Sequence, residues 1–344
     1  MNNQANKDCK YKEVKLYGSR KGWEKDSAPM RRYFYENSLT FFKEELVHQS
    51  DLKFPLYLNI EPSLECDSHC VMCPRTKSKR PIGNMDWALY NKIIHQILEY
   101  GPTKVVTFHK DGEPLMHPRL EDMIKYGKKS GAMEFTHFNT NAFSLDEERA
   151  RKLLDCGVDD ITMSIDAVTE ETFWKVKGCG SLAEVERNVL RLLELRRKKN
   201  QNIPWIRCKI IAMDITENEI ELFITRWSGV ADEVQVQEVH NYGGAVEYMP
   251  QIMNRYPCQS WWYTMAINWD GTVSICSVDY SGLYPLGDIK KNSLKDIWNG
   301  SKIKNARKAL LAGNYNDVPI CKNCTVWQVG PDMTDWYRQM ENIL

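Results

Sequence analysis

The sequence has no excess of charge of either sign and no long apolar run. It contains 46 lysines and arginines and 46 aspartates and glutamates, so its formal net charge is zero. A neutral chain has no electrostatic basis for binding nucleic acid or an anionic membrane, and we expect neither as a partner. No apolar stretch reaches the length of a transmembrane helix, and the polar residues 1–8 lack the pattern of a signal peptide. These absences predict a cytoplasmic protein.

The cysteines are the most informative residues that the sequence does contain. There are eleven of them in 344 residues, a length that allows one large core and a smaller module. Disulfides are rare in cytoplasmic proteins, so such cysteines are expected to bind metal or to be buried. Seven of them fall into two groups, which are Cys66, Cys70 and Cys73, and Cys258, Cys276, Cys321 and Cys324.

The first group has the spacing C-x3-C-x2-C and follows an apolar run at residues 56–60. Three thiolates at this spacing fit within one short loop, and soft sulfur ligands select an iron–sulfur cluster or zinc. A closed four-iron cluster or a structural zinc site needs four protein ligands. One coordination position is therefore left for something other than the protein. Taken alone, the spacing also fits three buried or zinc-bound cysteines.

This loop resembles the signature of the radical S-adenosylmethionine (radical SAM) superfamily, including an apolar residue, Met72, before the last cysteine. The resemblance implies a [4Fe–4S] cluster whose open iron binds the amino and carboxylate groups of S-adenosyl-L-methionine (SAM). It also implies that SAM is cleaved to a 5′-deoxyadenosyl radical, which abstracts a hydrogen atom from the substrate. A flavodoxin- or ferredoxin-type protein is the electron donor that the family implies.

Residues 56–240 alternate short β-rich runs with amphipathic segments. The β-rich runs are residues 56–60, 104–108, 134–138, 160–165, 205–212 and 233–239. Repeated strand–helix alternation predicts an α/β fold with parallel strands and helices outside. Six units fit the partial (β/α)6 TIM barrel that the resemblance implies. Capping-box patterns predict helix starts at Ser144, Ser181 and Thr216.

We expect three parts in the chain. Residues 1–55 form an N-terminal extension or lid with a helix over 37–47, residues 56–245 form the barrel, and residues 246–344 form a small Cys-rich domain with a C-terminal helix. Prolines and glycines that interrupt the strand–helix rhythm after residue 241 mark the second boundary.

The stretch after the second predicted strand is Asp111-Gly112-Glu113-Pro114, which resembles the G-G-E-P motif of the superfamily. The resemblance implies that Gly112, Glu113 and Pro114 bind SAM, with the carboxylate near the SAM ammonium. A carboxylate is a suitable partner for a cation in a dry site. Asp111 stands where relatives have glycine.

Two further strand ends resemble SAM-binding motifs. Asn141 lies in a stretch similar to the family's T-N-G turn, with Ala142 in place of the glycine. Ser164 and Asp166 match positions that contact the ribose and carboxylate of SAM in relatives. Lys177 stands near the place of an arginine that the family often has.

The second cysteine group is a complete ligand set. Cys258 and Cys276 flank a hairpin predicted to turn at residues 270–271, and Cys321 and Cys324 form a C-x2-C pair. Four thiolates close one cluster or one tetrahedral zinc site, and the bare pattern fits both. Behind a radical SAM barrel we favour iron–sulfur.

The Cys-rich domain resembles the auxiliary-cluster domains called SPASM and, more closely, their shortened form called twitch. Residues 325–330 supply no further cysteine, so we predict one auxiliary cluster and two [4Fe–4S] clusters in all. The ligand spacing is similar to that of radical SAM aminocyclitol dehydrogenases.

A cluster closed by four protein ligands has no position for substrate, so its natural role is to accept or relay an electron. Loss of a hydrogen atom, a proton and an electron turns a secondary alcohol into a ketone. We therefore favour oxidation of a secondary alcohol on a sugar or aminocyclitol. The alternative is radical modification of a ribosomally made peptide, by epimerisation or cross-linking. A third possibility is a non-catalytic iron–sulfur or zinc protein.

Oxidation of an alcohol needs a base for the hydroxyl proton. His240 and Glu238 follow the sixth predicted strand and are expected to face the cavity, and histidine has a suitable pKa. His109 and Lys110, at the end of the second strand, are further candidates.

Four cysteines remain outside the two groups. Unpaired cysteines are usually buried hydrophobic residues, and we expect this of Cys156. Cys208, on the fifth strand, and Cys179, beside a glycine turn, are candidates for thiols that face the barrel interior. Cys9 belongs to no motif.

Overall fold

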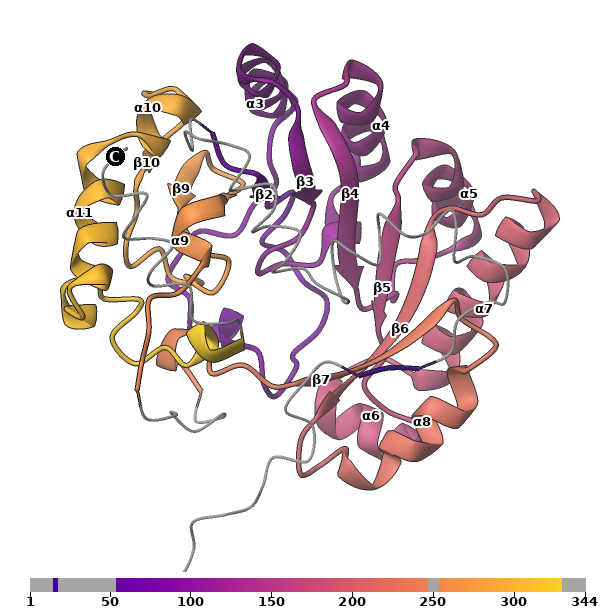
Figure 1. Cartoon of the computed structure of the whole chain (residues 1–344). Coiled ribbons are helices and arrows are strands. Elements are labelled where there is room, and N and C mark those ends of the chain that lie inside the picture. Colours follow the sequence, from indigo (N-terminus) through magenta and orange to yellow (C-terminus); the bar gives the residue numbers. More distant parts are fainter. Residues whose placement is uncertain (1–14, 18–53, 247–253, 330–344) are drawn as a thin grey trace, which may run out of the picture.

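A computed structural model of the chain describes residues 15–17, 54–246 and 254–329. The predicted helix over residues 37–47 and Cys9 lie outside the described residues. The six predicted strands are all present and parallel: β2 (Tyr57–Ile60), β3 (Thr103–Thr107), β4 (Met133–Thr140), β5 (Asp160–Ser164), β6 (Trp205–Ala212) and β7 (Glu233–Glu238). They form a curved sheet (Figure 1), and the predicted α/β fold with a partial barrel is confirmed.

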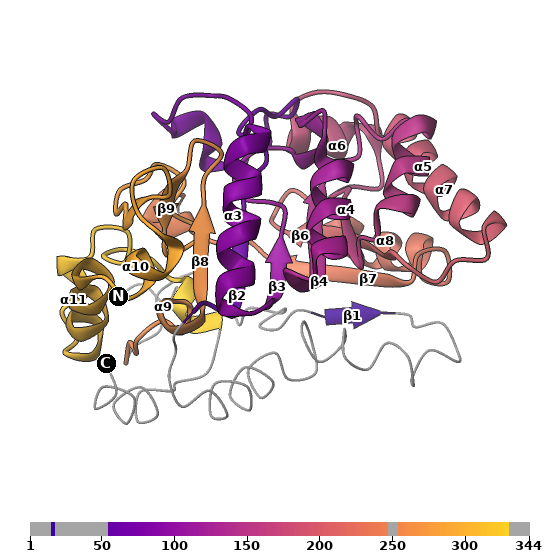
Figure 2. The ribbon, with the colours of Figure 1, turned by 90° about the horizontal axis from the view of Figure 1, so that it is seen from above.

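Helices connect these strands and cover the outer face of the sheet (Figures 1 and 2). They are α3 (Trp87–Tyr100), α4 (Leu120–Ser130), α5 (Glu147–Cys156), α6 (Glu170–Lys177), α7 (Leu182–Lys198) and α8 (Ile220–Trp227). Short 3-10 helices are η2 (Pro74–Lys77), η3 (Pro114–Met116), η4 (Glu217–Glu219), η5 (Tyr242–Gly244), η6 (Tyr315–Asp317) and η7 (Val326–Val329).

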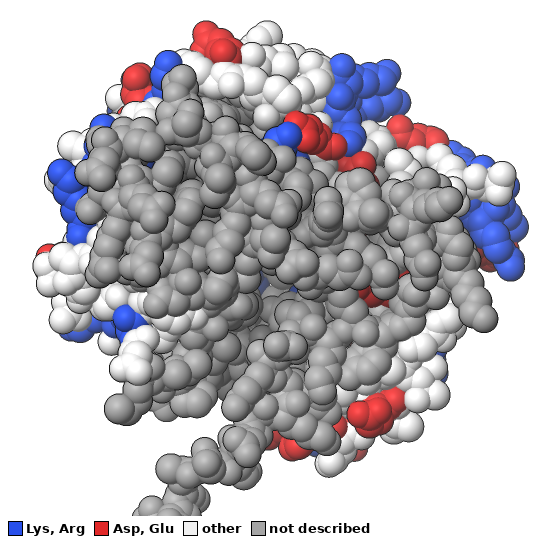
Figure 3. Space-filling model, in the orientation of Figure 1, with Lys and Arg blue, Asp and Glu red and all other residues white. Residues whose placement is uncertain are grey.

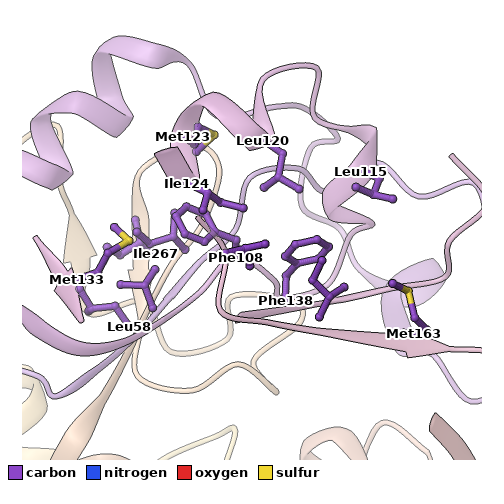
Figure 4. Close-up of a cluster of buried hydrophobic side chains, with 14 of the residues drawn as sticks. Leu58, Phe108, Leu115, Leu120, Met123, Ile124, Met133, Phe138, Met163 and Ile267 are labelled. Carbon is purple, nitrogen blue, oxygen red and sulfur yellow. The ribbon is translucent and has the colours of Figure 1, made fainter. Parts of the chain in front are cut away.

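The hydrophobic core lies between the strands and these helices. Leu58, Phe108 and Phe138 on or beside the strands meet Leu120 and Ile124 of α4, and none of the five is exposed (Figure 4). Burial of a side chain of this size stabilises the fold by about 1.5–3 kcal/mol. Because alternate strand residues point to opposite faces, the remaining strand residues face the barrel interior.

None of the three predicted capping-box residues caps a helix through its side chain. Thr216 precedes η4, but its hydroxyl accepts from the Met213 N–H at 3.0 Å and donates to the Ile211 carbonyl at 2.6 Å. Helix α5 begins after Asp146, whose carboxylate accepts a hydrogen bond from the Arg149 backbone N–H, so Ser144 does not cap it. Ser144 instead donates a hydrogen bond of 3.2 Å to the Asp67 carboxylate. Ser181 does precede α7, but its hydroxyl caps no N–H of that helix and donates to Glu170. Both aspartate and serine are good N-caps, so the pattern alone did not separate Asp146 from Ser144.

Each edge of the six-stranded sheet is paired with another strand. β1 (Lys15–Tyr17) runs antiparallel to β7, and β8 (Thr264–Ile267) runs parallel to β2. β9 (Thr272–Ser274) and β10 (Gly287–Asp288) follow, giving a sheet of ten strands in the described residues, in the order β1-β7-β6-β5-β4-β3-β2-β8-β9-β10. Figure 2 shows β8 beside β2. The barrel and the Cys-rich segment therefore share one sheet.

The Cys-rich segment has a small core of its own. α9 (Ser260–Tyr263), α10 (Leu294–Trp298) and α11 (Ser301–Leu311) pack beside the β8–β9 hairpin, whose predicted turn is confirmed by Gly271 at φ 89°. Trp261, Trp262 and Trp298 are fully buried there. The Arg307 guanidinium donates to the Trp261 carbonyl at 2.8 Å and fixes α11 to α9.

Two surface properties agree with the composition. On the face shown in Figure 3, acidic and basic side chains are interspersed among the described residues around the rim. No helix in the described part of the chain combines the length and the apolar character that crossing a bilayer demands.

Candidate functional site

A cavity of about 140 Å³ lies at the carboxyl ends of the barrel strands and opens to solvent. This is the end at which TIM-type barrels carry their active sites. Nine residues that the sequence assigned to metal or SAM binding line it: Cys66, Cys70, Met72, Cys73, Gly112, Glu113, Asn141, Ser164 and Asp166. The wall also contains His109, Lys110, Lys177, Lys209 and Tyr242.

The loop with the first three cysteines is attached to the end of α6. The His69 N–H donates to the Lys177 carbonyl and the Val71 N–H to the Val176 carbonyl, both at 2.9 Å. Gly178 ends the helix with φ 70°, and a Cβ at this position would lie 3.2 Å from the His69 Cβ. Glycine is favoured here by both its conformation and the close approach of the loop.

Hydrogen bonds within the loop direct its thiols toward the cavity. The Cys73 N–H donates to the Cys70 carbonyl at 3.0 Å, and the Ser68 hydroxyl lies 3.0 Å from the Cys70 sulfur. Burial, and after it the Glu113 carboxylate, raises the pKa of Cys66 to about 12. Burial raises the pKa of Cys73 to about 11. Thiols in such a setting ionise when a metal binds them, so the donor set fits an iron–sulfur cluster.

The second cysteine group is likewise assembled in one place. Burial, followed by the neighbouring Cys258 and Cys324 thiols, raises the pKa of Cys276 well above its usual value. Burial and then the Cys258 thiol raise the pKa of Cys321 and Cys324 as well. Four thiols whose negative charges would repel one another need a bound cation, and four thiolates are the complete ligand set of a [4Fe–4S] cluster.

Among the residues described, no group of three or more His, Cys, Asp and Glu side chains is arranged to hold one metal ion. In a four-iron cluster each thiolate binds a different iron, whereas zinc gathers all of its ligands around one point.

Arg255 and its stacking partner hold the Cys321–Cys324 turn from one side. The Arg255 guanidinium donates to the carbonyl groups of Cys321 and Lys322, the latter at 3.1 Å. It also lies 4.0 Å above the ring of Tyr315. The arginine is therefore fixed beside two of the predicted ligands and offsets part of their negative charge.

Asn241 holds the same turn from the barrel side. Its amide N–H donates to the Asn323 carbonyl at 2.7 Å, and its amide oxygen accepts from the Thr325 N–H at 3.0 Å. Tyr242, the next residue, lines the cavity. The loop after β7 thus contacts both predicted cluster sites through consecutive residues.

Gly112 lies where two backbone segments touch. A Cβ on Gly112 would lie 2.1 Å from the Ser63 carbonyl oxygen, which no side chain tolerates. The neighbouring Glu113 N–H donates to the Glu65 carbonyl at 2.7 Å. The glycine therefore allows the end of β3 to support the cysteine loop, one residue before Cys66.

The Glu113 carboxylate already accepts three hydrogen bonds within the protein. The donors are the Leu115 N–H at 3.0 Å, the Thr140 hydroxyl at 2.7 Å and the Asn141 N–H at 2.8 Å. A carboxylate has about four acceptor positions, so one is left for a ligand. Burial raises the pKa of Glu113 to about 7. Contact with the SAM ammonium stays a prediction. Pro114 begins η3 and does not line the cavity.

Asp111, in place of the family's glycine, belongs to a buried ion network. Its carboxylate accepts from Arg80 at 3.0 Å and also from Lys110, and Arg80 pairs with Glu61. Lys110 donates in addition to the Asp279 carbonyl at 3.0 Å. The substitution thus links the end of β3 to the Cys-rich segment.

The turn after β4 also departs from the family pattern without losing its shape. Ala142 has φ 61°, in the left-handed region that the family's glycine adopts without steric cost. Asn141 forms the contact that matters to the site, since its side-chain N–H donates to the Asp67 carboxylate at 2.6 Å.

The end of β5 is fixed by an ion pair. Lys177 donates to the Asp166 carboxylate and to the Ser164 carbonyl, both at 2.7 Å. The second oxygen of Asp166 accepts from the Ile211 N–H at 2.9 Å, and Asp166 has φ 63°. Strained non-glycine residues of this kind are common at functional sites. Lys177, whose role the sequence left open, orients the predicted SAM-binding residues.

The predicted bases are placed differently. His240 is absent from the described cavity wall. Its Nε2 lies 3.1 Å from the Gln237 amide nitrogen, and its Nδ1 is buried without a hydrogen-bond partner among the described residues. Burial, with Lys209 next, lowers the pKa of His240 to about 4. The side chain of Glu238 lies outside the described residues. His109 and Lys110 do line the cavity.

The sequence analysis missed Lys209 and Tyr242 and misplaced Cys208. Cys208 is completely buried, and its neighbours include Glu186 of α7, so it faces the helices. The next residue, Lys209, faces the cavity. Period-two alternation along this strand contains the signal that identifies Lys209. Cys156 packs as predicted, and the Cys179 thiol donates to the Asp67 carbonyl at 3.1 Å.

Comparison with known families agrees with this geometry. The radical SAM superfamily matches residues 60–244, which is more than half of the chain. The protein belongs to the radical SAM superfamily. An iron–sulfur cluster-binding domain, SPASM, matches residues 258–325. Two [4Fe–4S] clusters and SAM are accordingly its cofactors, as predicted.

Relatives cover most of the chain at low identity. A SAM-dependent 2-deoxy-scyllo-inosamine dehydrogenase from Niallia circulans is 23% identical and covers 78% of this chain and 91% of its own. A tungsten-containing aldehyde ferredoxin oxidoreductase cofactor-modifying protein from Pyrococcus furiosus is 22% identical over 78% of this chain and 87% of its own.

Solved structures share the fold. BtrN in complex with AdoMet and 2-DOIA has a TM-score of 0.55 at 20% identity, covering 79% of this chain and 93% of its own. Streptococcus suis SuiB bound to the precursor peptide SuiA has a TM-score of 0.63 at 13% identity, covering 88% and 77%.

Proposed function

We propose that this protein oxidises a secondary alcohol of a sugar or cyclitol to a ketone. The observation that carries the proposal is the auxiliary group of four thiols, the half-buried Cys258 and Cys276 and the buried Cys321 and Cys324. These ligands fill every protein-binding position of a cluster and leave none for substrate. Such a centre is suited to accepting an electron.

The relatives support this reaction over the peptide alternative. The Niallia circulans relative is a dehydrogenase by name, and this chain spans nearly its full length. The likeness to peptide-bound SuiB concerns the fold alone, at 13% identity. Epimerisation or cross-linking of a peptide is therefore the second candidate.

The chain's own residues fit binding and orienting the cofactors. The loop of Cys66, Cys70 and Cys73 would hold the first cluster, and the ends of β3, β4 and β5 would hold SAM. When bound, these groups supply the 5′-deoxyadenosyl radical that takes a hydrogen atom from the carbinol carbon. The pair of Lys177 and Asp166 keeps one wall of the cavity rigid while this occurs.

The hydroxyl proton needs an acceptor of only modest strength. Once a hydrogen atom and an electron have left the alcohol, the remaining group is a protonated carbonyl, which is a strong acid. Burial lowers the pKa of His109 to about 3 and that of His240 to about 4, so both imidazoles are neutral at pH 7. His109 lines the cavity. We propose His109 as the proton acceptor beside the originally predicted His240, because it alone of the two is on the described wall.

The product mass tests the reaction. Anaerobically reconstituted protein, given SAM and a reductant, should form a product about two mass units lighter than the alcohol, with one SAM consumed per ketone. The product formed in deuterated water should contain no deuterium at the reacting carbon. A product one unit heavier in deuterated water would contradict oxidation and favour epimerisation.

Two further proposals concern the setting of the reaction. A flavodoxin- or ferredoxin-type protein supplies the electron that reduces the first cluster, as in the superfamily. The location is cytoplasmic, because seven thiol ligands in two clusters require a reducing compartment.

A further inference from the structure

One charged side chain on the cavity wall has no counter-ion among the described residues, and it is Lys209. It lies near the end of β6, 7% exposed, and its neighbours in register are Ser164 of β5 and Gln235 of β7. No ion pair or side-chain hydrogen bond is found for it within the described part of the chain. Burying an ammonium group without a partner costs free energy. Such a group is therefore expected where a bound ligand supplies the missing counter-charge.

The acidic residues on the wall do not serve as that partner. Asp111 is paired with Lys110 and Arg80, and Asp166 with Lys177. Glu113 accepts hydrogen bonds from three protein donors. Lys209 is therefore an ammonium group on the described wall with no carboxylate bound to it.

Other cations surround Lys209. Burial lowers its pKa; Lys177 and Arg207 lower it further, while Asp166, which is bound to Lys177, and the Cys70 thiol oppose them. Arg207 is itself engaged with Asp160 and Glu233 one layer deeper in the barrel. An added anion would relieve this repulsion, whereas an added cation would increase it.

A second residue of the cavity wall, His109, has an unpaired polar atom among the described residues. Nδ1 of His109 is buried without a hydrogen-bond partner among the described residues. After burial, Lys209 contributes most to lowering the pKa of His109, so the two side chains are close. A neutral imidazole can donate one N–H, and a charge-assisted bond to an anion is stronger than a neutral one.

We propose that Lys209 and His109 bind an anionic group of the substrate, a phosphate or a carboxylate. The inference rests on the proposed oxidation of an alcohol and narrows its substrate. The alcohol is an acidic or phosphorylated sugar or cyclitol, and an aminocyclitol is disfavoured because its ammonium would face Lys209. His109 then holds the anion through one nitrogen, and its other nitrogen is the proton acceptor.

Binding of four small alcohols tests this site without turnover. Calorimetry would use reconstituted protein saturated with SAM, and glycerol 3-phosphate, glycerate, glycerol and 2-amino-1,3-propanediol as probes. We expect the better of the two anions to bind at least about 10-fold more tightly than glycerol, and the amine no more tightly than glycerol. The relative affinities for glycerol 3-phosphate and glycerate show whether the site prefers phosphate or carboxylate.

Two variants locate the preference. Lys209→Met should reduce the affinity for the anion to that for glycerol, and Lys209→Arg should retain most of the preference. Lys199→Met is the matched control, because Lys199 is exposed and pairs with Asp155 on the surface. If Lys209→Met fails to bind its clusters, the anion preference is still tested by comparing the affinities of Lys209→Arg and of the unaltered protein for the anions and for glycerol.

Three outcomes would overturn the proposal. They are equal affinities for the anions and glycerol, an anion preference that survives in Lys209→Met, and a loss of SAM affinity in Lys209→Met with unchanged anion binding. The last would assign Lys209 to the SAM carboxylate. Anion binding through Lys209 without ketone formation from any alcohol would support this site and contradict the proposed oxidation.

Discussion

Asn141 and Asp67 join the end of β4 to the cysteine loop. The hydrogen bond of 2.6 Å from the Asn141 amide reaches the residue that follows Cys66, and Ser144 donates to the other carboxylate oxygen at 3.2 Å. Asn141 is buried, so its loss leaves a carboxylate with fewer donors in a poorly hydrated place. The position of the first predicted cluster ligand thus depends on a contact between its neighbour Asp67 and a residue 74 positions further along the chain.

The first prediction concerns this link. Asn141→Ala should weaken SAM binding by about 10-fold, because losing a hydrogen bond to a charged group costs about 1.5–3 kcal/mol and frees the loop. Equilibrium binding of SAM to reconstituted protein measures this. The control is Asn91→Ala, which removes a 2.6 Å hydrogen bond with Tyr126 on the helical side of the sheet. Unchanged SAM affinity in Asn141→Ala would contradict a role for this link.

The second prediction is a pH dependence of SAM binding. Burial raises the pKa of Glu113 to about 7 from a usual value of 4.5. In the protein without SAM, this group therefore favours folding below its unfolded pKa, and that contribution is lost as the pH rises through about 7. The SAM ammonium favours the ionised carboxylate, so SAM affinity should rise as the pH rises through about 7.

Glu113→Gln provides the comparison for this pH profile. The variant should bind SAM more weakly at pH 8, with a flatter dependence between pH 6 and 8. Glu121→Gln, in which an ion pair with Arg149 is lost on α4, should keep the original profile. Affinity that falls with rising pH in the unaltered protein would show that Glu113 does not face the SAM ammonium.

The third prediction concerns Asn241 and the auxiliary cluster. Asn241→Ala removes hydrogen bonds to the backbone of residues 323 and 325, on both sides of Cys324. We expect the auxiliary cluster to be lost more readily, with 5′-deoxyadenosine still formed and the ketone reduced at least about 10-fold. Chromatographic quantification of 5′-deoxyadenosine and of the ketone measures the ratio of the two products.

The matched control for Asn241 is its own partner. Asn323 takes part only through its backbone carbonyl in the described contacts, so Asn323→Ala should leave the product ratio unchanged. Equal loss of 5′-deoxyadenosine and ketone in Asn241→Ala would show that the substitution damages the first cluster instead.

The fourth prediction is metal content. Reconstituted protein should contain about eight irons per chain, from two four-iron clusters, and no stoichiometric zinc. Replacing Cys66, Cys70 and Cys73 with alanine should remove about four irons and abolish SAM cleavage, because no iron is then held open for SAM. Replacing Cys321 and Cys324 should remove the other four while some SAM cleavage persists. About four irons with one zinc in the unaltered protein would contradict an auxiliary iron–sulfur cluster.

The residues that sequence reasoning located have signals that are local in the chain. Cys66, Gly112 and Asp166 stand in short motifs at the ends of β-rich runs, and parallel strands bring those ends together. Lys209 had a local signal too. Ile206 and Ile210 alternate with it along the strand and are fully buried on the helical side, so the face of Lys209 follows from its position.

Other features depend on partners that no local pattern identifies. The network of Arg80, Glu61, Asp111 and Lys110 joins charges from three separate places in the sequence, and the sequence pattern around each of them is that of a surface residue. Pairing of β8 with β2 brings together segments about 200 residues apart, and four-residue strands do not specify a partner by pattern.

The pairing of β8 with β2 also governs when the barrel is complete during synthesis. β2 pairs with β3 on one side, and on the other its partner is β8, which ends at Ile267. A ribosome adds about 5–20 residues per second, so β2 waits roughly 10–40 seconds for that partner. Throughout this interval it presents an apolar strand with a free hydrogen-bonding edge, which is a site for aggregation. Slower translation of residues 61–267 should therefore lower the soluble yield, and a chaperone that binds extended apolar segments should restore it.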